Sequence, residues 1–169
     1  IVYVGVERDL KGHPSLIQHV DGDFTILINS NADPRLAPMG CSSVTLVAPI
    51  GYRDFPERDS REYDERKRPF AALLVRKAAE VVPELGSGVV VLDAATPRTL
   101  EAYTGMPEGA LYGFDQSSSG RRPHFRAPIK GLYFVGSSTY PGAGIESVIV
   151  SGMMCANDIS GWDVMKGAG

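Results

Sequence analysis

Apolar and polar residues alternate in the first half of the chain, a pattern typical of β-strands. Between residues 23 and 29, Phe24, Ile26 and Ile28 occupy every second position. Residues 1–6 and 43–49 form two more segments of this kind. Turn-forming pairs, Asp-Gly at 21–22 and Asp-Pro at 33–34, separate the segments, which favours an antiparallel meander.

A different spacing follows, in which apolar residues recur every three or four positions, as on the buried face of a helix. These residues are Phe70, Leu73, Leu74, Ala78, Val81 and Val82. Pro83 is expected to end the helix. The stretch before it, residues 57–68, holds five acidic and five basic side chains, so we interpret it as a solvated helix start or a loop.

The middle of the chain predicts one more strand and a short helix. The strand covers residues 88–92. Thr96 is a suitable N-cap and Pro97 suits the first helical position. We therefore expect a short helix over 99–104, ended by Gly105.

Residues 106–128 have the composition of a loop. They are rich in glycine and proline and contain the serine run 117–119. They also contain a basic cluster of Arg121, Arg122 and Arg126. Such a segment is suited to line a site or an interface.

The C-terminal part predicts a strand over 131–136, a glycine-rich turn over 137–142 and a helix over 143–159 that stops at Gly161. This order of elements offers free backbone N–H groups and a helix dipole to an anion. One helix face is expected to be buried, with Gly152 permitting close packing. That face consists of Ile145, Val148, Ile149, Met153, Ala156 and Ile159.

The local pattern alone leaves open whether this turn binds a ligand or only folds tightly. Glu146, in the first helical turn, favours the second interpretation, because a carboxylate there stabilises the helix but opposes an anionic ligand. No Rossmann fingerprint, P-loop, nucleophile elbow or metal-ligand spacing is present. His13, His19 and His124 are expected to be surface or turn residues.

Composition and charge narrow the class of protein. The chain has 169 residues, 43% of them hydrophobic and 22% charged, as in a globular domain. A net charge of -3 argues against nucleic acid as a partner. No apolar run is long enough to span a membrane, and the first residues do not form a secretory signal. Cys41 and Cys155 are expected to be buried, reduced thiols, as in a cytoplasmic protein. Peripheral contact of this protein with a membrane stays open.

The segment GLYFVGSSTYPGAGIESVIVSGMMCANDI, residues 131–159, closely resembles the C-terminal FAD-contacting signature of phytoene desaturases, carotenoid isomerases and retinol saturases. Residues 33–40 resemble that family's D-P-x-x-A-P-x-G segment, and a T-L-x-x-P strand follows at 45–49. Further residues that match in order are Thr96, Pro97, Gly113, Gln116, Arg122 and Pro123. The resemblance therefore spans essentially the whole chain.

The resemblance implies the C-terminal portion of an FAD-dependent oxidoreductase of the phytoene dehydrogenase type, in carotenoid biosynthesis. The implied fold is α/β (α+β): an antiparallel substrate-domain sheet with helices, plus a strand-turn-helix that completes a Rossmann-like FAD domain. Residues 1–105 would belong to the substrate-binding domain, 106–130 to a connecting loop, and 131–169 to the FAD domain. The substrate would be apolar, such as a carotenoid or retinoid.

The same resemblance implies that FAD binds only together with an N-terminal dinucleotide-binding half, and that this fragment alone is inactive. The implied cofactor-binding residues are Gly136, Ser137, Ser138, Thr139, Gly142, Gly144, Ile145 and Glu146. No catalytic side chain and no metal ligand is assigned. Tyr140 and Glu146 depart from the family, in which many members have His and a small residue or Pro.

Two alternatives stay open. In the first alternative, the chain would be a non-catalytic structural or association module without flavin affinity. In the second, it would be part of an amine-oxidase-like flavoprotein. The latter should show an aromatic cage, and Tyr133, Phe134 and Tyr140 do not decide the question.

Overall fold

The computed structural model describes residues 1–113, 117 and 120–161. These residues fall into two units, Ile1–Gly109 and Ala110–Gly169. Gln116 and the end of the predicted FAD-domain segment, 162–169, lie outside the described residues. The described elements give a mixed α/β fold, in agreement with the predicted class.

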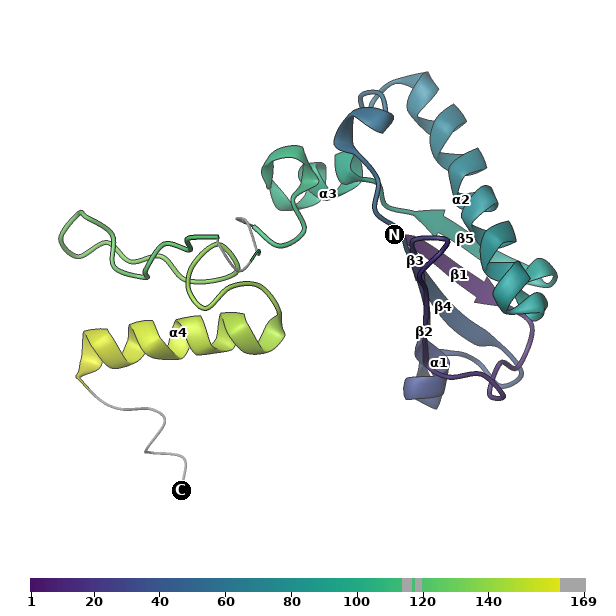
Figure 1. Ribbon diagram of the computed structural model, residues 1–169, viewed down its shortest axis with the longest axis horizontal. Coiled ribbons are helices and arrows are strands. Elements are labelled where there is room, and N and C mark those ends of the chain that lie inside the picture. Colours follow the sequence, from purple (N-terminus) through teal and green to yellow (C-terminus); the bar gives the residue numbers. More distant parts are fainter. Residues whose placement is uncertain (114–116, 118–119, 162–169) are drawn as a thin grey trace. The chain divides into compact units, whose positions relative to one another are not determined.

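The first unit contains a five-stranded sheet in the order β2-β3-β4-β1-β5, with every pair antiparallel (Figure 1). Its strands are β1 (Val2–Val6), β2 (Leu16–His19), β3 (Phe24–Ile28), β4 (Ser42–Val47) and β5 (Val89–Ala94). The antiparallel prediction is confirmed, but the chain is not a simple meander. β1 lies between β4 and β5, because Val2 pairs with both Leu46 and Ala94.

The helix α2 (Arg61–Val81) packs on one face of this sheet. Strand residues at alternate positions meet it, among them Val2, Val4 and Val6. The predicted buried face of the helix is partly wrong. Leu73 is 41% exposed, whereas the buried positions are Ala71, Leu74, Val75 and Ala78. These four lie at i, i+3, i+4 and i+7, which is the single stripe that one sheet can cover.

The charged stretch before this helix is its solvated start, as one of the two interpretations had it. Helix α2 begins at Arg61, and most of its first two turns are exposed. Tyr63 is the exception, because it is buried against Phe55 in an edge-to-face ring contact. Pro83 comes two residues after the helix end, as expected for a stop.

Helix α3 (Pro97–Thr104) confirms the predicted caps. The Thr96 hydroxyl accepts a hydrogen bond from the Thr99 N–H, and Gly105 ends the helix in the left-handed conformation. The Tyr63 hydroxyl, from α2, lies 2.7 Å from the Thr96 hydroxyl oxygen and 2.6 Å from that of Thr99. The short helix is thereby fixed to α2. The remaining short elements are α1 (Asn29–Ala32) and the 3-10 turns Pro34–Leu36, Tyr52–Asp54, Pro83–Gly86 and Pro107–Gly109.

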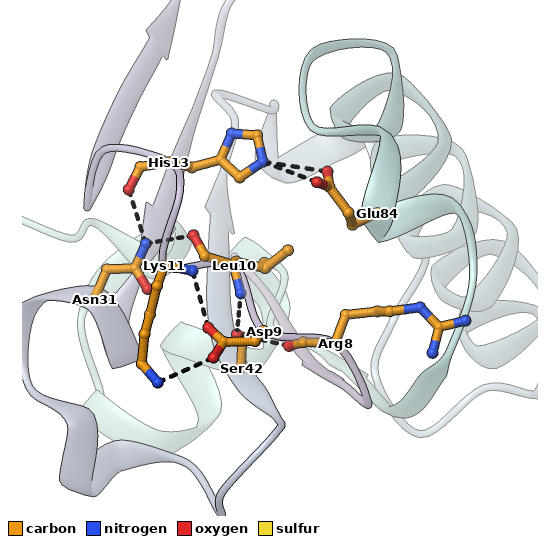
Figure 2. Close-up of polar contacts among 8 residues, drawn as sticks. All are labelled: Arg8, Asp9, Leu10, Lys11, His13, Asn31, Ser42 and Glu84. Atoms are coloured by element: carbon orange, nitrogen blue, oxygen red, sulfur yellow. Dashed lines mark hydrogen bonds and ion pairs between the residues drawn. The ribbon is translucent and has the colours of Figure 1, made fainter.

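Side chains far apart in sequence hold the loop between β1 and β2 (Figure 2). The Asn31 amide donates to the carbonyl oxygens of Leu10 and His13, each at 2.8 Å. The Ser42 hydroxyl accepts from the Leu10 N–H at 3.1 Å. His13 contacts the Glu84 carboxylate, with Nε2 3.2 Å from each oxygen. His13 therefore has a structural role.

The second unit contains α4 (Ile145–Ser160), which ends at Gly161 as predicted. The prediction of a strand at 131–136 is wrong. Among the described residues, this segment makes only an isolated bridge, between Arg126 and Tyr133. The flanking backbone bonds are Phe134 N–H to Phe125 O, at 2.8 Å, and Ala127 N–H to Leu132 O, at 3.1 Å. A strand needs a longer neighbour to pair its backbone groups, and the described chain supplies none there.

Candidate functional site

The glycine-rich segment before α4 forms a turn closed by its own polar groups. The N–H and hydroxyl of Thr139 both donate to the Gly136 carbonyl oxygen, at 3.1 and 3.0 Å. Gly136 has a φ of 114°, which side-chain-bearing residues rarely adopt. Ser137 and Ser138 are half-buried in this turn, and Thr139 is buried.

Two more glycines bring the chain from the turn into the helix. Gly142 is buried with a φ of 134°, and Gly144 is exposed with a φ of 103°. A Cβ added to Gly144 would meet only the Glu146 carboxylate, 3.9 Å away. The backbone at the helix entrance is therefore bare, with room beside it.

Helix α4 begins without a side-chain N-cap. Its first N–H groups, including those of Ile145 and Glu146, have no acceptor within the helix and carry the positive end of its dipole. Both residues are exposed. The helix entrance can thus donate hydrogen bonds to a ligand with negative charge or lone pairs.

Ser151 joins the turn to the helix, and the sequence reasoning did not identify it. This residue is fully buried. Its hydroxyl accepts a hydrogen bond from the Gly136 N–H at 3.2 Å and lies 2.8 Å from the Thr139 hydroxyl oxygen. The available signal was a lone polar residue between Val148 and Cys155 at helical spacing.

The structure gives Arg126, one of the three basic loop residues, a partner on α4. Its guanidinium binds the Asp158 carboxylate, with Nε 2.8 Å from Oδ2. The hydrogen bonds from Arg126 hold the pKa of Asp158 below its ordinary value. Arg126 is thus engaged in tying the loop to the helix. A pocket beside this pair is lined by apolar atoms of Pro123, Ala127, Pro128, Phe134 and Val135, and also by His124, Arg126, Ser138 and Thr139.

The apolar face of α4 is uncovered, which corrects the prediction that it is buried. Ile145 is 76% exposed and Ile149 is 55% exposed, whereas the buried positions are Ser151 and Cys155. The predicted face is apolar, but within the described part of its own unit Ala156 and Ile159 are also exposed, and only Val148 and Met153 are half-buried. Other exposed apolar residues of this unit are Leu111, Tyr112, Ile129, Leu132, Tyr133, Phe134, Val135, Tyr140 and Val150.

In the first unit, the sheet face opposite α2 carries an apolar pocket of about 460 Å³. Tyr3, Gly5 and Val91 come from the central and edge strands, and Leu36 and Pro38 come from the segment after α1. Cys41, which also lines this pocket, is a free thiol that is only half-buried, whereas Cys155 is buried as predicted.

The part of the chain that the structure describes offers neither a metal-ligand cluster nor a membrane-spanning helix. Residues 1–113, 117 and 120–161 hold no cluster of His, Cys, Asp or Glu that could bind a metal. Among the described helices, none combines the length and the apolar character needed to cross a membrane.

The chain matches no protein-family model. It is 27% identical to the chloroplastic prolycopene isomerase of Daucus carota over 143 residues, 82% of this chain and 23% of that protein. It is 33% identical to the lycopene-forming phytoene desaturase of Pseudescherichia vulneris over 144 residues, 80% of this chain and 28% of that protein. It is 32% identical to the pyridine nucleotide-disulfide oxidoreductase domain-containing protein 2 of Rattus norvegicus over 129 residues, 71% of this chain and 22% of that protein.

The chain thus spans about a quarter of the length of the curated relatives it matches. The names of these relatives match the family that residues 131–159 resemble. By its sequence, the chain belongs to the phytoene desaturase and carotenoid isomerase family.

Proposed function

We propose that this chain is the C-terminal portion of an FAD-dependent oxidoreductase that acts on carbon–carbon bonds of an apolar, carotenoid-like or retinoid-like substrate. The names of the relatives, a prolycopene isomerase and a phytoene desaturase, support the type of reaction. The observation that carries the proposal is the bare, exposed entrance of α4 behind three glycines of positive φ.

The residues at this entrance fit a flavin. Gly136, Ser137 and Ser138 would face the ribityl chain and phosphates. The buried Thr139 and Gly142 would support the shape of the turn from behind. The N–H groups of Gly144, Ile145 and Glu146 would point at the pyrimidine edge of the ring. There they would stabilise the negative charge of the reduced flavin, as oriented amides do elsewhere.

Bound FAD would supply the hydride and electron chemistry, while the protein would supply orientation and electrostatics. The open sheet face, with Tyr3, Gly5 and Val91, would form part of the wall against an apolar substrate. Its apolar lining suits a hydrocarbon chain that offers no hydrogen-bonding groups.

The proposed partner of α4 is the N-terminal dinucleotide-binding half of the same protein. The uncovered Ile145 and Ile149 support this, because a soluble domain rarely leaves such a row of large aliphatic side chains in water. The phosphates of FAD would bind mainly to that half, so we expect this fragment alone to be inactive.

The test uses the full-length parent protein and two matched glycine variants, Gly144→Ala and Gly161→Ala. Both glycines have a positive φ and space for a Cβ, but they lie at opposite ends of α4. We expect Gly144→Ala to lose bound flavin, measured from its visible absorbance per polypeptide, and Gly161→Ala to retain it. Thermal melting of the purified proteins checks that both variants fold.

Flavin retained in Gly144→Ala, or in a parent that lacks residues 131–169, would refute the site assignment. A parent without any flavin would favour the non-catalytic association module. Amine oxidation by the flavin-loaded parent would favour the amine-oxidase-like alternative.

A further inference from the structure

The strand β5 is an unusual edge. It lies at one end of the sheet and pairs with β1 on one side only. Four consecutive aliphatic residues, 89–92, are exposed on it, and Val90 and Val91 reach 58% and 56%. Edge strands that face water are normally short or protected by charges. The opposite edge, β2, fits that rule better, because it is shorter and contains Gln18 and His19.

The backbone of β5 is ready to accept another strand. Ala95 exchanges both backbone hydrogen bonds with Ile1, at 2.8 and 2.9 Å. Because alternate residues of an antiparallel strand point their backbone groups to the same side, Asp93 and Val91 also face β1. Leu92 therefore directs its N–H and C=O away from β1, to the side on which the described residues supply no strand.

One end of this free edge is closed. The Ala94 N–H, which also points away from β1, donates to its neighbour's Asp93 Oδ1 at 2.7 Å. Lys67, on α2, lies 3.6 Å from the same carboxylate oxygen. A new strand can thus pair at Leu92, while Asp93 competes with it at Ala94. Toward the start of β5, the register with β1 shifts between Gly5 and Val6, so the regular alternation holds from Val91 onward.

A groove lies beside the 92–94 end of β5 and gives space where a paired strand would leave the edge. Helix α2 lines one side of it and β5 the other, and its volume is about 560 Å³. Small residues, Ala71 and Ala72, leave the space open beside Leu92. The charged residues that line it are Asp64, Lys67, Arg68 and Asp93. An extended segment laid there would pair with β5 and have one face covered by α2.

We propose that β5 is an internal strand in the complete protein, and that a strand from the part of the polypeptide outside residues 1–169 pairs with it under α2. This rests on the proposed function in one respect, the membership of the chain in a longer protein. The matched relatives are about four times as long as their matched region, so such a protein has ample chain for the strand. Apolar residues at alternate positions would suit the incoming segment, since its covered face meets Leu92 and Ala71.

Amide hydrogen exchange of the full-length parent, resolved to single residues, tests the proposal. We expect the Leu92 amide to be protected to within about tenfold of the Val91 amide, which faces β1. An open edge would instead let Leu92 exchange on the order of 100-fold faster than Val91, and this result would overturn the proposal. The measurement does not involve flavin, so loss of flavin binding and loss of protection are separate outcomes.

A second copy of the chain is the competing occupant. Protection by a second copy weakens when the protein is diluted about 100-fold, by mass action, whereas protection by the same polypeptide does not. Dilution-dependent protection would therefore also overturn the proposal.

A pair of variants supplies a second readout in the parent. Proline is tolerated at an edge position whose N–H faces solvent, but not where that N–H is paired. We expect Leu92→Pro to lose amide protection at 89–91 and to lower the melting temperature, whereas Leu92→Val keeps the protection and the melting temperature of the parent. A Leu92→Pro parent that melts like Leu92→Val would contradict the inference.

Discussion

Replacing Thr96 by alanine should destabilise the first unit through two separate hydrogen-bonding roles. The Thr96 hydroxyl caps α3 by accepting from the Thr99 N–H. Loss of an N-cap costs about 1 kcal/mol and up to about 2 kcal/mol. The same hydroxyl is one of two partners of the Tyr63 hydroxyl. Loss of that bond adds roughly 0.5–1.5 kcal/mol.

The lost methyl group of Thr96, which is buried, contributes about 0.8 kcal/mol. The three contributions give about 2–4 kcal/mol for Thr96→Ala. Thr96→Ser is the matched control, because it keeps the hydroxyl and loses only the methyl, so about 0.8 kcal/mol is expected. Urea denaturation of the 169-residue chain, followed by far-UV circular dichroism, gives both free energies of unfolding.

A double-mutant cycle with Tyr63→Phe isolates the bond between the two helices. The coupling free energy of Tyr63 and Thr96 should be about 0.5–1.5 kcal/mol. The reasoning fails if Thr96→Ala and Thr96→Ser unfold at the same urea concentration, or if the two sites are additive.

Two further predictions concern other polar contacts. Ser151→Ala removes a buried hydroxyl that contacts Thr139 and accepts a backbone N–H, so it should cost about 1–3 kcal/mol, whereas Ser160→Ala, on the exposed side of the same helix, should cost under about 0.5 kcal/mol in the same urea experiment. The Tyr52 hydroxyl, which donates to Glu101, holds the pKa of Glu101 below its ordinary value of 4.5. The stabilisation by this carboxylate is therefore present above pH 4.5 and lost as the pH falls through the lower folded pKa, so Glu101→Gln should flatten the fall in melting temperature below pH 4.5. A melting profile of Glu101→Gln that parallels the wild type at acidic pH would count against this contact.

The sequence predicted best what depends on neighbouring residues. The caps of α3, Thr96 and Gly105, were predicted correctly because the hydrogen bonds and backbone angle that they satisfy are local. The place of β1 between β4 and β5 was not predicted, because turn signals describe only consecutive strands. β2 was missed because its four residues, 16–19, form too short a pattern to stand out.

The same distinction applies to the candidate site. The glycines at 136, 142 and 144 were expected, because a tight approach of the backbone selects that residue type, and all three have a positive φ. Ser151 was missed, because its two partners lie 12 and 15 positions away and only the fold brings them together. The exposed face of α4 was read as buried, because the apolar pattern does not reveal which segment covers it.

The Asp93 side chain has a consequence for engineering of the sheet. By holding the Ala94 amide, it limits the length over which any added peptide can align with β5, and so restricts the choice of register. A peptide designed to compete with the proposed incoming strand should therefore be short and end opposite Leu92. A longer peptide would have to displace a carboxylate that Lys67 also attracts.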